Sequence, residues 1–211
     1  MAAASARVAV FAKAPEPGEV KTRLIPALGA AAAAELQRRL IERTLEAALA
    51  AGIGPVELWC SPDASHPFFL DCARRYAIAL AVQGGVDLGE RMQLALDALL
   101  GAGERALLIG SDIPALTPQY LREADSALAA GCDAVLGPAE DGGYVLIGLR
   151  RSAPSLFAGM RWGGSDVCEQ TRARLAQVGM RYRELAVLWD VDRPEDLPRL
   201  EAMKNWGQSD I

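Results

Sequence analysis

The fold class is decided by one stretch of the chain, Ala106-Leu107-Leu108-Ile109-Gly110-Ser111-Asp112-Ile113-Pro114-Ala115-Leu116. Its four apolar residues at the start are typical of a strand buried on both faces of a parallel sheet, although a buried helix has the same pattern. The glycine and proline that follow favour a strand that ends abruptly. Ligands of open α/β sheets bind outside the carboxyl ends of the strands. Asp112 is therefore either a ligand-facing residue or a residue that forms a turn or caps the helix beginning near Thr117.

The length and composition bound the class of protein. The 211 residues suit one domain spanning residues 1–211, with residues 203–211 as a flexible tail. The formal net charge of −5 disfavours a nucleic-acid-binding surface. Four irregularly spaced cysteines and a single histidine argue against a zinc site and for a reducing compartment. No apolar run approaches the ~18 residues of a membrane span, and the first six residues are too short for a signal peptide, so we expect a cytoplasmic protein.

The remaining segments alternate between strand and helix patterns. They predict an α/β fold, a three-layer α-β-α sandwich with a mainly parallel, twisted sheet. The predicted strands are residues 7–12, 56–60, 78–83, 106–109, 133–137, 145–149 and 181–187. The predicted helices are residues 29–51, 67–75, 117–129 and 163–178, the last capped by Ser165, together with a helix opened by residues 84–92 that runs to about residue 100 and a short helix after Pro194.

A basic, proline-rich segment, Lys13–Pro26, follows the first predicted strand. Its three prolines and one glycine predict an irregular loop, and loops of this length in compact domains are usually functional or disordered. Lys13, Lys21 and Arg23 give it a local positive charge suited to phosphate groups. The alternative is an ordinary solvated surface loop.

Three further segments carry polar groups where a ligand would bind. Residues 84–92 open a helix, and their glycines serve either a close approach of backbone to an anion or a tight turn. Asp141-Gly142-Gly143-Tyr144 either joins two strands or offers a carboxylate and backbone N–H groups to a substrate. Asp192 follows the last strand and is either a metal ligand or a helix N-cap.

The expected topology brings these segments together. If the first and fourth strands are neighbours, the basic segment faces Asp112 across a switch point of the sheet. Asp112 and Asp192 could then hold Mg²⁺ against a phosphate chain, because Mg²⁺ takes only one or two carboxylates beside phosphate oxygens and water. The chain has no P-loop sequence, no Gly-x-Gly-x-x-Gly after the first strand and no Gly-x-Ser-x-Gly, which disfavours the corresponding enzyme classes.

The motifs also resemble a known family. The segment Ala12–Leu24 resembles the opening signature of the uncharacterised transferases labelled DUF2064, within the GT-A-fold nucleotide-diphospho-sugar transferases and related to MobA/CofC-like nucleotidyltransferases. Four later segments resemble that family's motifs in order: residues 87–92, 110–114, 137–144 and 190–192. One departure is the sequence Trp-Gly-Gly-Ser at residues 162–165, where relatives tend to carry Trp-Ser-Thr.

The resemblance implies a GT-A fold, a nucleotide ligand and a divalent metal, Mg²⁺ or Mn²⁺. It implies that Asp112 and Asp192 bind the metal. The catalytic residues implied are Lys21, Arg23 and Asp112, and the implied phosphate-binding residues are Lys13, Lys21, Thr22, Arg23 and Ser111. The implied substrate-binding residues are Asp87, Arg91, Asp141, Gly142, Gly143 and Tyr144.

These expectations leave three functions open. The first is a metal-dependent transferase that passes a glycosyl group from a nucleotide-diphospho-sugar to a small-molecule acceptor. The second is a nucleotidyltransferase that joins an NTP to a phosphorylated or acidic small molecule with release of pyrophosphate. The cluster of cations favours the second function, because a triphosphate can form ion pairs with several cations at once. The third is a nucleotide-binding module without turnover. The oligomeric state is open.

Overall fold

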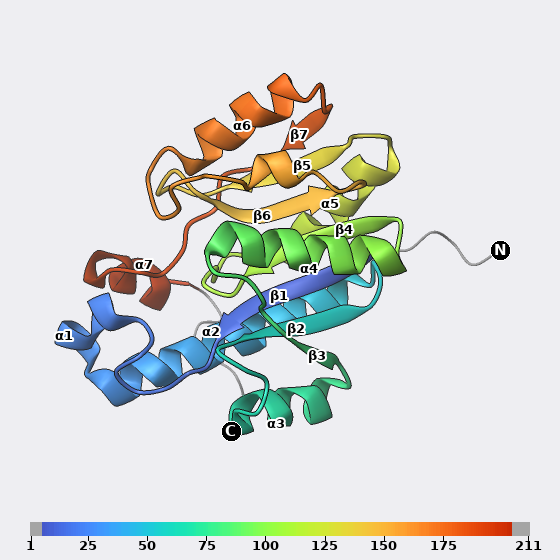
Figure 1. Cartoon of the computed structure of the whole chain (residues 1–211). Helices are drawn as coiled ribbons and strands as arrows, with labels where there is room; N and C mark the ends of the chain where they lie inside the picture. The colour runs from blue at the N-terminus through green and yellow to red at the C-terminus, as the bar shows by residue number, and fades with distance from the viewer. Residues whose placement is uncertain (1–5, 204–211) are drawn as a thin grey trace.

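The chain folds around one seven-stranded sheet, which the computed structural model describes within residues 6–203 (Figure 1). The strand order is β3-β2-β1-β4-β6-β5-β7, and β6 alone runs antiparallel to its neighbours among the strands described. The strands are β1 (Ala6–Lys13), β2 (Val56–Ser61), β3 (Ala79–Val82), β4 (Arg105–Gly110), β5 (Ala134–Pro138), β6 (Tyr144–Leu149) and β7 (Tyr182–Glu184). The α/β class and the mainly parallel sheet are confirmed.

Helices cover both faces of this sheet. They are α1 (Ile25–Leu28), α2 (Ala30–Ala51), α3 (Pro67–Tyr76), α4 (Leu88–Ala102), α5 (Pro118–Ala129), α6 (Val167–Gln177) and α7 (Leu197–Glu201), with short 3-10 turns at Thr22–Leu24, Pro154–Leu156 and Pro194–Asp196. No helix within residues 6–203 is long and apolar enough to cross a bilayer.

The alternation of side chains along β1 shows how the three layers are held together. Val8 and Val10 belong to a core that includes buried residues of α2, α3 and α5. Ala9 and Phe11 point to the other face and belong to a second core with α4 and α6. A strand covered on both faces needs apolar residues at consecutive positions, which is why the strand segments read as continuous apolar runs.

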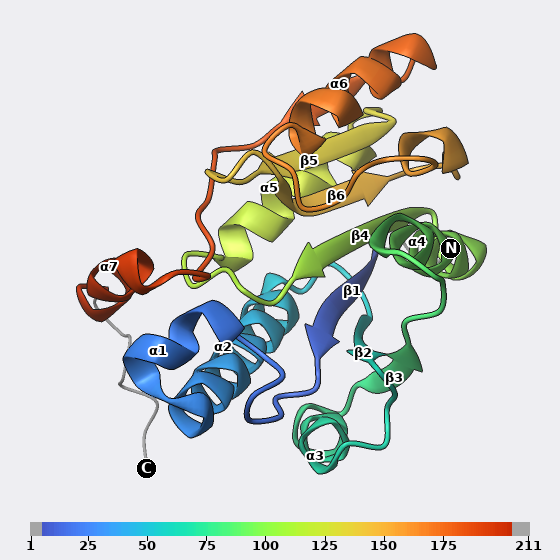
Figure 2. The same ribbon diagram turned by 60° about the vertical axis from the view of Figure 1, so that its left-hand side comes forward.

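The two central strands carry the candidate site at their carboxyl ends. β1 pairs in parallel with β4, with Val8 opposite Leu107 and Val10 opposite Ile109. The expectation that the first and fourth strands are neighbours is therefore confirmed. Both strands point the same way in Figure 2, so the segment after Lys13 and the segment after Gly110 leave the sheet at the same edge.

A third, smaller apolar cluster fixes the end of the chain against this edge. It joins Leu24, Leu36 and Leu40 to Trp189, Val191 and Leu200. Figures 1 and 2 both show α7 beside α1. The backbone N–H of Val191 donates to the carbonyl oxygen of Asp112 at 2.9 Å. Packing of α7 thus brings residues 189–192 back to the end of β4.

Three local expectations differ from the structure. The basic segment is not wholly irregular, because Lys21 adopts a left-handed conformation (φ 49°) that turns the chain into a 3-10 turn and α1. Helix α6 begins at Val167 with Asp166 at its N-cap, so Ser165 is not the cap. Gly163, at φ 82°, is incompatible with a helix starting there. The last strand is only Tyr182–Glu184, and residues 204–211 of the expected tail lie outside the described part of the chain.

Candidate functional site

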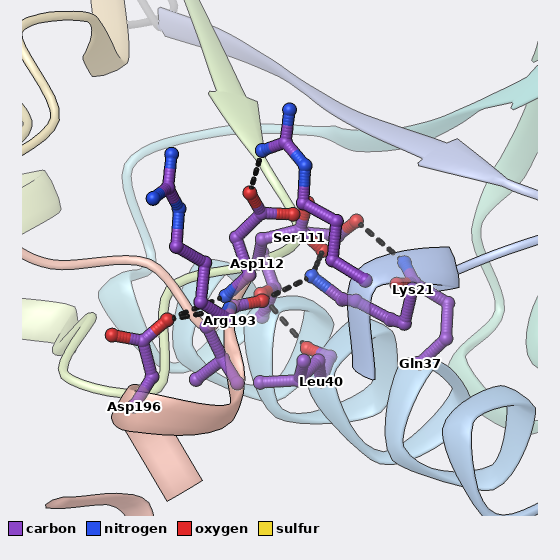
Figure 3. Close-up of polar contacts among 11 residues, drawn as sticks. Lys21, Gln37, Leu40, Ser111, Asp112, Arg193 and Asp196 are labelled. Atoms are coloured by element: carbon purple, nitrogen blue, oxygen red, sulfur yellow. Dashed lines mark hydrogen bonds and ion pairs between the residues drawn. The ribbon is translucent and has the colours of Figure 1, made fainter. Parts of the chain in front are cut away.

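Lys21 is the centre of the polar contacts at the carboxyl ends of β1 and β4. Its Nζ lies 2.7 Å from Oδ1 of Asp112 and donates to the carbonyl oxygen of Val191 at 2.6 Å. The Lys21 side chain is only 4% exposed, whereas that of Asp112 is 46% exposed. One cation therefore joins three segments that are far apart in the sequence. Figure 3 shows it reaching Asp112 beside Ser111 and Gln37.

Asp192 is the second carboxylate of the predicted metal pair. Its carboxylate forms an ion pair with the guanidinium of Arg23. The alternative role as a helix N-cap is not what the structure shows, because Arg193 occupies the N-cap position of the following 3-10 turn. The carboxylate of Asp196 accepts from the backbone N–H groups of Asp192 and Arg193 (Figure 3). Asp192 is thus left to face the basic segment.

Asp112 likewise does not act as a helix cap. The N-cap of α5 is Thr117, whose hydroxyl accepts from the backbone N–H of Tyr120 at 3.2 Å. The carboxylate of Asp112 is instead directed at Lys21. The structure therefore supports the ligand-facing position of Asp112 over its local structural alternative.

The side chains after β1 and β4 line a cavity of about 440 Å³, which we call the basic pocket. Three cations line it: Lys13, Lys21 and Arg91. Its floor includes the buried Ser111, whose hydroxyl accepts from Gln37 Nε2 at 3.3 Å. The outer wall is formed by the ends of β2 and β3. Glu19, Asp112 and Asp192 line it as well, so the pocket offers lysine and arginine side chains to a phosphate chain and carboxylates to a cation.

A second cavity of about 230 Å³, the aromatic pocket, lies on the other side of Asp112. Tyr144 and Trp162 form part of its wall, with Met92 beside them. The two rings meet edge to face with centroids 6.5 Å apart. Desolvation by burial raises the pKa of the Tyr144 hydroxyl, so Tyr144 stays neutral at physiological pH.

Carboxylates line the rim of the aromatic pocket. Asp112, Asp141 and Asp190 are the only charged residues that line it in the part of the chain that the structure describes. Burial, reinforced by the neighbouring charge of Asp141, raises the pKa of Asp190 to about 6. Asp141 accepts from the backbone N–H of Gly143 at 2.8 Å, which fixes its carboxylate at the turn before β6.

The two pockets meet at the end of β4. Leu88, Gly110 and Asp112 line both of them. A third cavity of about 410 Å³, the outer pocket, shares Asp192 with the basic pocket and shares Asp141 and Asp190 with the aromatic pocket. The three cavities therefore form one cleft, and Asp112 stands where a ligand in the basic pocket would meet a ligand in the aromatic pocket.

The carboxylates predicted to hold a metal ion are each in an ion pair, Asp112 with Lys21 and Asp192 with Arg23. No cluster of three or more His, Cys, Asp or Glu that could hold a metal occurs within residues 6–203. A cage built from protein alone is thus missing there, but Mg²⁺ needs only one or two carboxylates when phosphates and water complete its shell. Asp112 and Asp192 would supply these carboxylates.

The structure places the other predicted residues as follows. Lys13 lines the basic pocket, where its Nζ donates to the carbonyl oxygen of Glu19 at 2.7 Å. Arg23 lines the outer pocket, and Thr22 is exposed at the start of the 3-10 turn. Arg91 lines the basic pocket from α4, with Nε 3.4 Å from the carbonyl oxygen of Gly85.

Two predicted substrate residues have structural tasks as well. Asp87 caps α4 by accepting from the backbone N–H of Glu90 at 2.9 Å. Gly142 has φ 89°, and a Cβ there would lie 1.9 Å from the carbonyl oxygen of Ser165, so only glycine fits. Gly143 and Tyr144 line the aromatic pocket. The roles of these residues toward a substrate stay predictions.

Several lining residues carried no assigned role in the sequence-based prediction. Asp190 was visible only as part of the segment 190–192, and Trp162 only as the start of the departing motif at residues 162–165. Gln83 lines the basic pocket and donates through Nε2 to the carbonyl oxygens of Ala12 and Trp59. A lone glutamine after a strand carries no sequence signal for such a position.

The fold, a mostly parallel seven-stranded sheet flanked by helices, is the one found in nucleotide-diphospho-sugar transferases. Solved structures support this class. A candidate nucleotide-diphospho-sugar transferase from Desulfovibrio desulfuricans G20 is 33% identical, with a TM-score of 0.86 over 97% of this chain and 91% of that chain. None of the curated proteins matches the chain.

Residues 44–164 match the family model described as "Uncharacterized protein conserved in bacteria (DUF2064)". The chain belongs to this family, as its motifs predict.

More distant structures share the fold alone. A CMP:2-keto-3-deoxy-manno-octonic acid synthetase complexed with CTP is 12% identical, with a TM-score of 0.60 over 94% of this chain and 97% of that chain. Glucosyl-3-phosphoglycerate synthase from Mycobacterium tuberculosis, in complex with Mn²⁺ and UDP, is 13% identical, with a TM-score of 0.57 over 94% of this chain and 76% of that chain. The neighbours thus include both nucleotidyltransferases and glycosyltransferases.

Proposed function

We propose that the protein is a metal-dependent glycosyltransferase, which binds a nucleotide-diphospho-sugar with Mg²⁺ or Mn²⁺ and passes the glycosyl group to a small-molecule acceptor. The observation that carries this proposal is the meeting of two unlike pockets at Asp112. One pocket is lined by three cations together with three carboxylates, and the other is lined mostly by apolar and aromatic side chains. A transfer reaction needs such a pair of adjoining sites, one for the charged donor and one for the acceptor.

The residues of the basic pocket would hold the diphosphate. Lys13, Lys21 and Arg91 would contact phosphate oxygens, and Arg23 is close enough to Asp192 to contact the donor from the outer side. Asp112 and Asp192 would hold the metal ion, which would supply charge neutralisation on the diphosphate leaving group. These cations and the metal together stabilise negative charge where it develops in the transition state.

The bond changes are those of a group transfer. An acceptor hydroxyl or amine in the aromatic pocket would form a bond to the anomeric carbon of the donor. The bond from that carbon to the diphosphate oxygen breaks, and the nucleoside diphosphate leaves with the electron pair. The acceptor loses a proton, for which the carboxylates of Asp141 and Asp190 are at hand on the rim of the pocket.

Nucleotidyl transfer is the second candidate function. It is favoured by the number of cations at the basic pocket, because a triphosphate carries more charge than a diphosphate. It is disfavoured by the other pocket. A phosphorylated or acidic second substrate would have to enter a cavity whose charged lining residues are all carboxylates.

A thermal unfolding screen separates these functions. The protein is mixed with NTPs, nucleoside diphosphates and nucleotide-diphospho-sugars, each with and without Mg²⁺ or Mn²⁺. A ligand at ~100 times its Kd stabilises the native state by about 2.7 kcal/mol, which corresponds to a rise in Tm of roughly 5–10 °C for a chain of this size. We expect a metal-dependent rise with one nucleotide-diphospho-sugar. A rise with an NTP and none with any nucleotide-sugar would replace the proposal with the second candidate function.

The variant Asp112→Asn tests the site within the same assay. The amide keeps the size of the side chain and removes the charge that would hold the metal, so the metal-dependent part of the Tm rise should disappear while the free protein stays folded. Asp71→Asn is the matched control, because Asp71 pairs with Arg74 on α3 and lines none of the three pockets. If nucleotides stabilise the unmodified protein but it transfers no glycosyl group to any acceptor tested, the third function, a nucleotide-binding module without turnover, is supported.

A further inference from the structure

One wall of the aromatic pocket is closely packed. Trp162 stacks on Phe157 with ring centroids 6.4 Å apart and meets Tyr144 edge to face. A Cβ at Gly89 would lie 2.6 Å from Nε1 of Trp162, so the indole packs directly on the backbone of α4. The hydroxyl of Tyr144 is 3.9 Å from Sδ of Met92. Apolar pockets with fixed walls of this kind are largely formed before the ligand arrives.

The size of the pocket limits the body of its ligand. Its volume is about 230 Å³. Apolar cavities of roughly 150 Å³ hold a benzene molecule. The aromatic pocket is therefore large enough for a single ring with a short side chain. Leu88, Ile113, Val145 and Val167 complete an apolar lining.

The charged residues at the rim of the aromatic pocket limit the charge that its ligand can carry. Within residues 6–203, the only charged side chains that line the pocket are the carboxylates of Asp112, Asp141 and Asp190. No lysine or arginine of this part of the chain lines it, whereas three line the basic pocket. An anionic ligand would meet the carboxylates of Asp141 and Asp190, while the Lys21 ammonium behind Asp112 is already paired with that residue. Like charges placed together cost several kcal/mol in a protein interface.

We infer that the aromatic pocket binds an acceptor with an apolar, ring-sized body that carries a hydroxyl or amine and no carboxylate, phosphate or sulfate. This inference rests on the proposed function for its assignment of the ligand as an acceptor. The apolar walls hold the body, and the carboxylates of the rim accept hydrogen bonds from the O–H or N–H group. The same carboxylates exclude acidic acceptors.

Binding of matched probes tests the chemistry of the pocket without nucleotide or metal. Four probes of similar size are titrated by saturation-transfer NMR: 2-phenylethanol, 2-phenylethylamine, phenylacetate and methyl β-D-glucopyranoside. We expect the alcohol and the ammonium probe to bind at least about ten-fold more tightly than phenylacetate, because one charge of the wrong sign costs more than the 1.4 kcal/mol of a ten-fold change. The glucoside should bind most weakly, because it cannot fill the apolar lining.

Three variants assign the binding to this pocket. Trp162→Ala should weaken the binding of 2-phenylethanol at least about ten-fold, since the substitution removes a wall of the pocket. Truncation of a packed indole also lowers stability, so Asp141→Asn provides a test that does not depend on packing. The amide still accepts a hydrogen bond but no longer repels an anion, so the ratio of the Kd of phenylacetate to the Kd of 2-phenylethanol should fall. Glu140→Gln is the matched control, because Glu140 is the neighbouring carboxylate but pairs with Arg199 and lies outside the aromatic pocket.

The opposite results overturn the inference. Phenylacetate binding as tightly as the alcohol would show that the rim does not select against anions. If methyl β-D-glucopyranoside binds more tightly than the aromatic probes, the cavity is a site for the donor sugar. Absence of binding by both the alcohol and the amine, or indifference of 2-phenylethanol binding to Trp162→Ala, would remove the cavity as the site for the apolar body. Failure of the proposed function has a different signature, namely selective probe binding in a protein that no nucleotide stabilises.

Discussion

Removal of the Lys21 amine should have opposite effects on two ligands. In the variant Lys21→Met, the carboxylate of Asp112 loses the cation that lies 2.7 Å away, and the carbonyl oxygen of Val191 loses its donor. If Asp112 binds a metal ion, Lys21 competes with that metal as long as no phosphate draws the amine away. The variant should therefore bind Mn²⁺ more tightly in the absence of nucleotide and bind the nucleotide less tightly.

The magnitude follows from the contact and its exposure. Two unit charges at this distance attract by about 6 kcal/mol at an effective dielectric constant of 20. Much of this is offset because Asp112, 46% exposed, is hydrated when it is unpaired. A hydrogen bond to a charged group contributes about 1.5–3 kcal/mol net. Relief from this competition should tighten Mn²⁺ binding by roughly ten-fold or more, at 1.4 kcal/mol for each factor of ten.

The assay separates the two ligands. Free Mn²⁺ is followed by electron paramagnetic resonance during a titration without nucleotide, and nucleotide affinity is measured by calorimetry at saturating Mn²⁺. Lys13→Met is the matched control, because Lys13 lines the same pocket but its Nζ contacts Glu19 and not Asp112. The control variant should bind the nucleotide less tightly and bind Mn²⁺ with unchanged affinity. Weaker or unchanged Mn²⁺ binding by Lys21→Met would refute the assignment of Asp112 as a metal ligand in competition with Lys21.

Two further predictions concern packing and thiol chemistry. Gly89→Ala should lower the free energy of unfolding by about 1–3 kcal/mol in urea titrations, because the new methyl group would overlap the indole of Trp162. The control is Gly101→Ala on the same helix, where a Cβ would meet nothing within 4 Å, so this variant should be neutral or stabilised by up to about 1 kcal/mol. Equal effects of the two substitutions would contradict the overlap. Burial raises the pKa of the Cys60 thiol to about 12 and that of the Cys72 thiol to about 11. Both thiols should therefore resist alkylation by iodoacetamide at pH 8 until the protein is unfolded, which mass spectrometry would measure. Rapid labelling of either cysteine in the native protein would contradict its burial.

The order of strands and helices could be predicted from the sequence because it depends on local patterns. Continuous apolar runs predicted the strands, and the helix from residue 30 was visible from its apolar face and the glycines that end it. The turn into α1 could not be predicted, because the left-handed conformation of Lys21 is stabilised by contacts with Asp112 and Val191, which are distant in the sequence. A lysine in that conformation has no local signature.

The candidate site was predicted in its centre but not at its edges. The meeting of Lys21 with Asp112 followed from one assumption, that the first and fourth strands are neighbours, and that assumption is confirmed. Trp162 was not given a role, because its place in the aromatic pocket depends on packing against a glycine on α4. The expected helix start at residue 163 placed this loop wrongly, since the positive φ of Gly163 keeps the backbone open there.

The reversed direction of β6 has a consequence for how such a protein can change its specificity. Because β6 is antiparallel between β4 and β5, the turn at residues 139–143 lies at the same edge of the sheet as the end of β4. This one turn places Asp141 and Tyr144 in the aromatic pocket and contributes nothing to the lining of the basic pocket. Insertions or exchanges within this turn of five residues could therefore change the proposed acceptor pocket and leave the proposed nucleotide pocket unaltered.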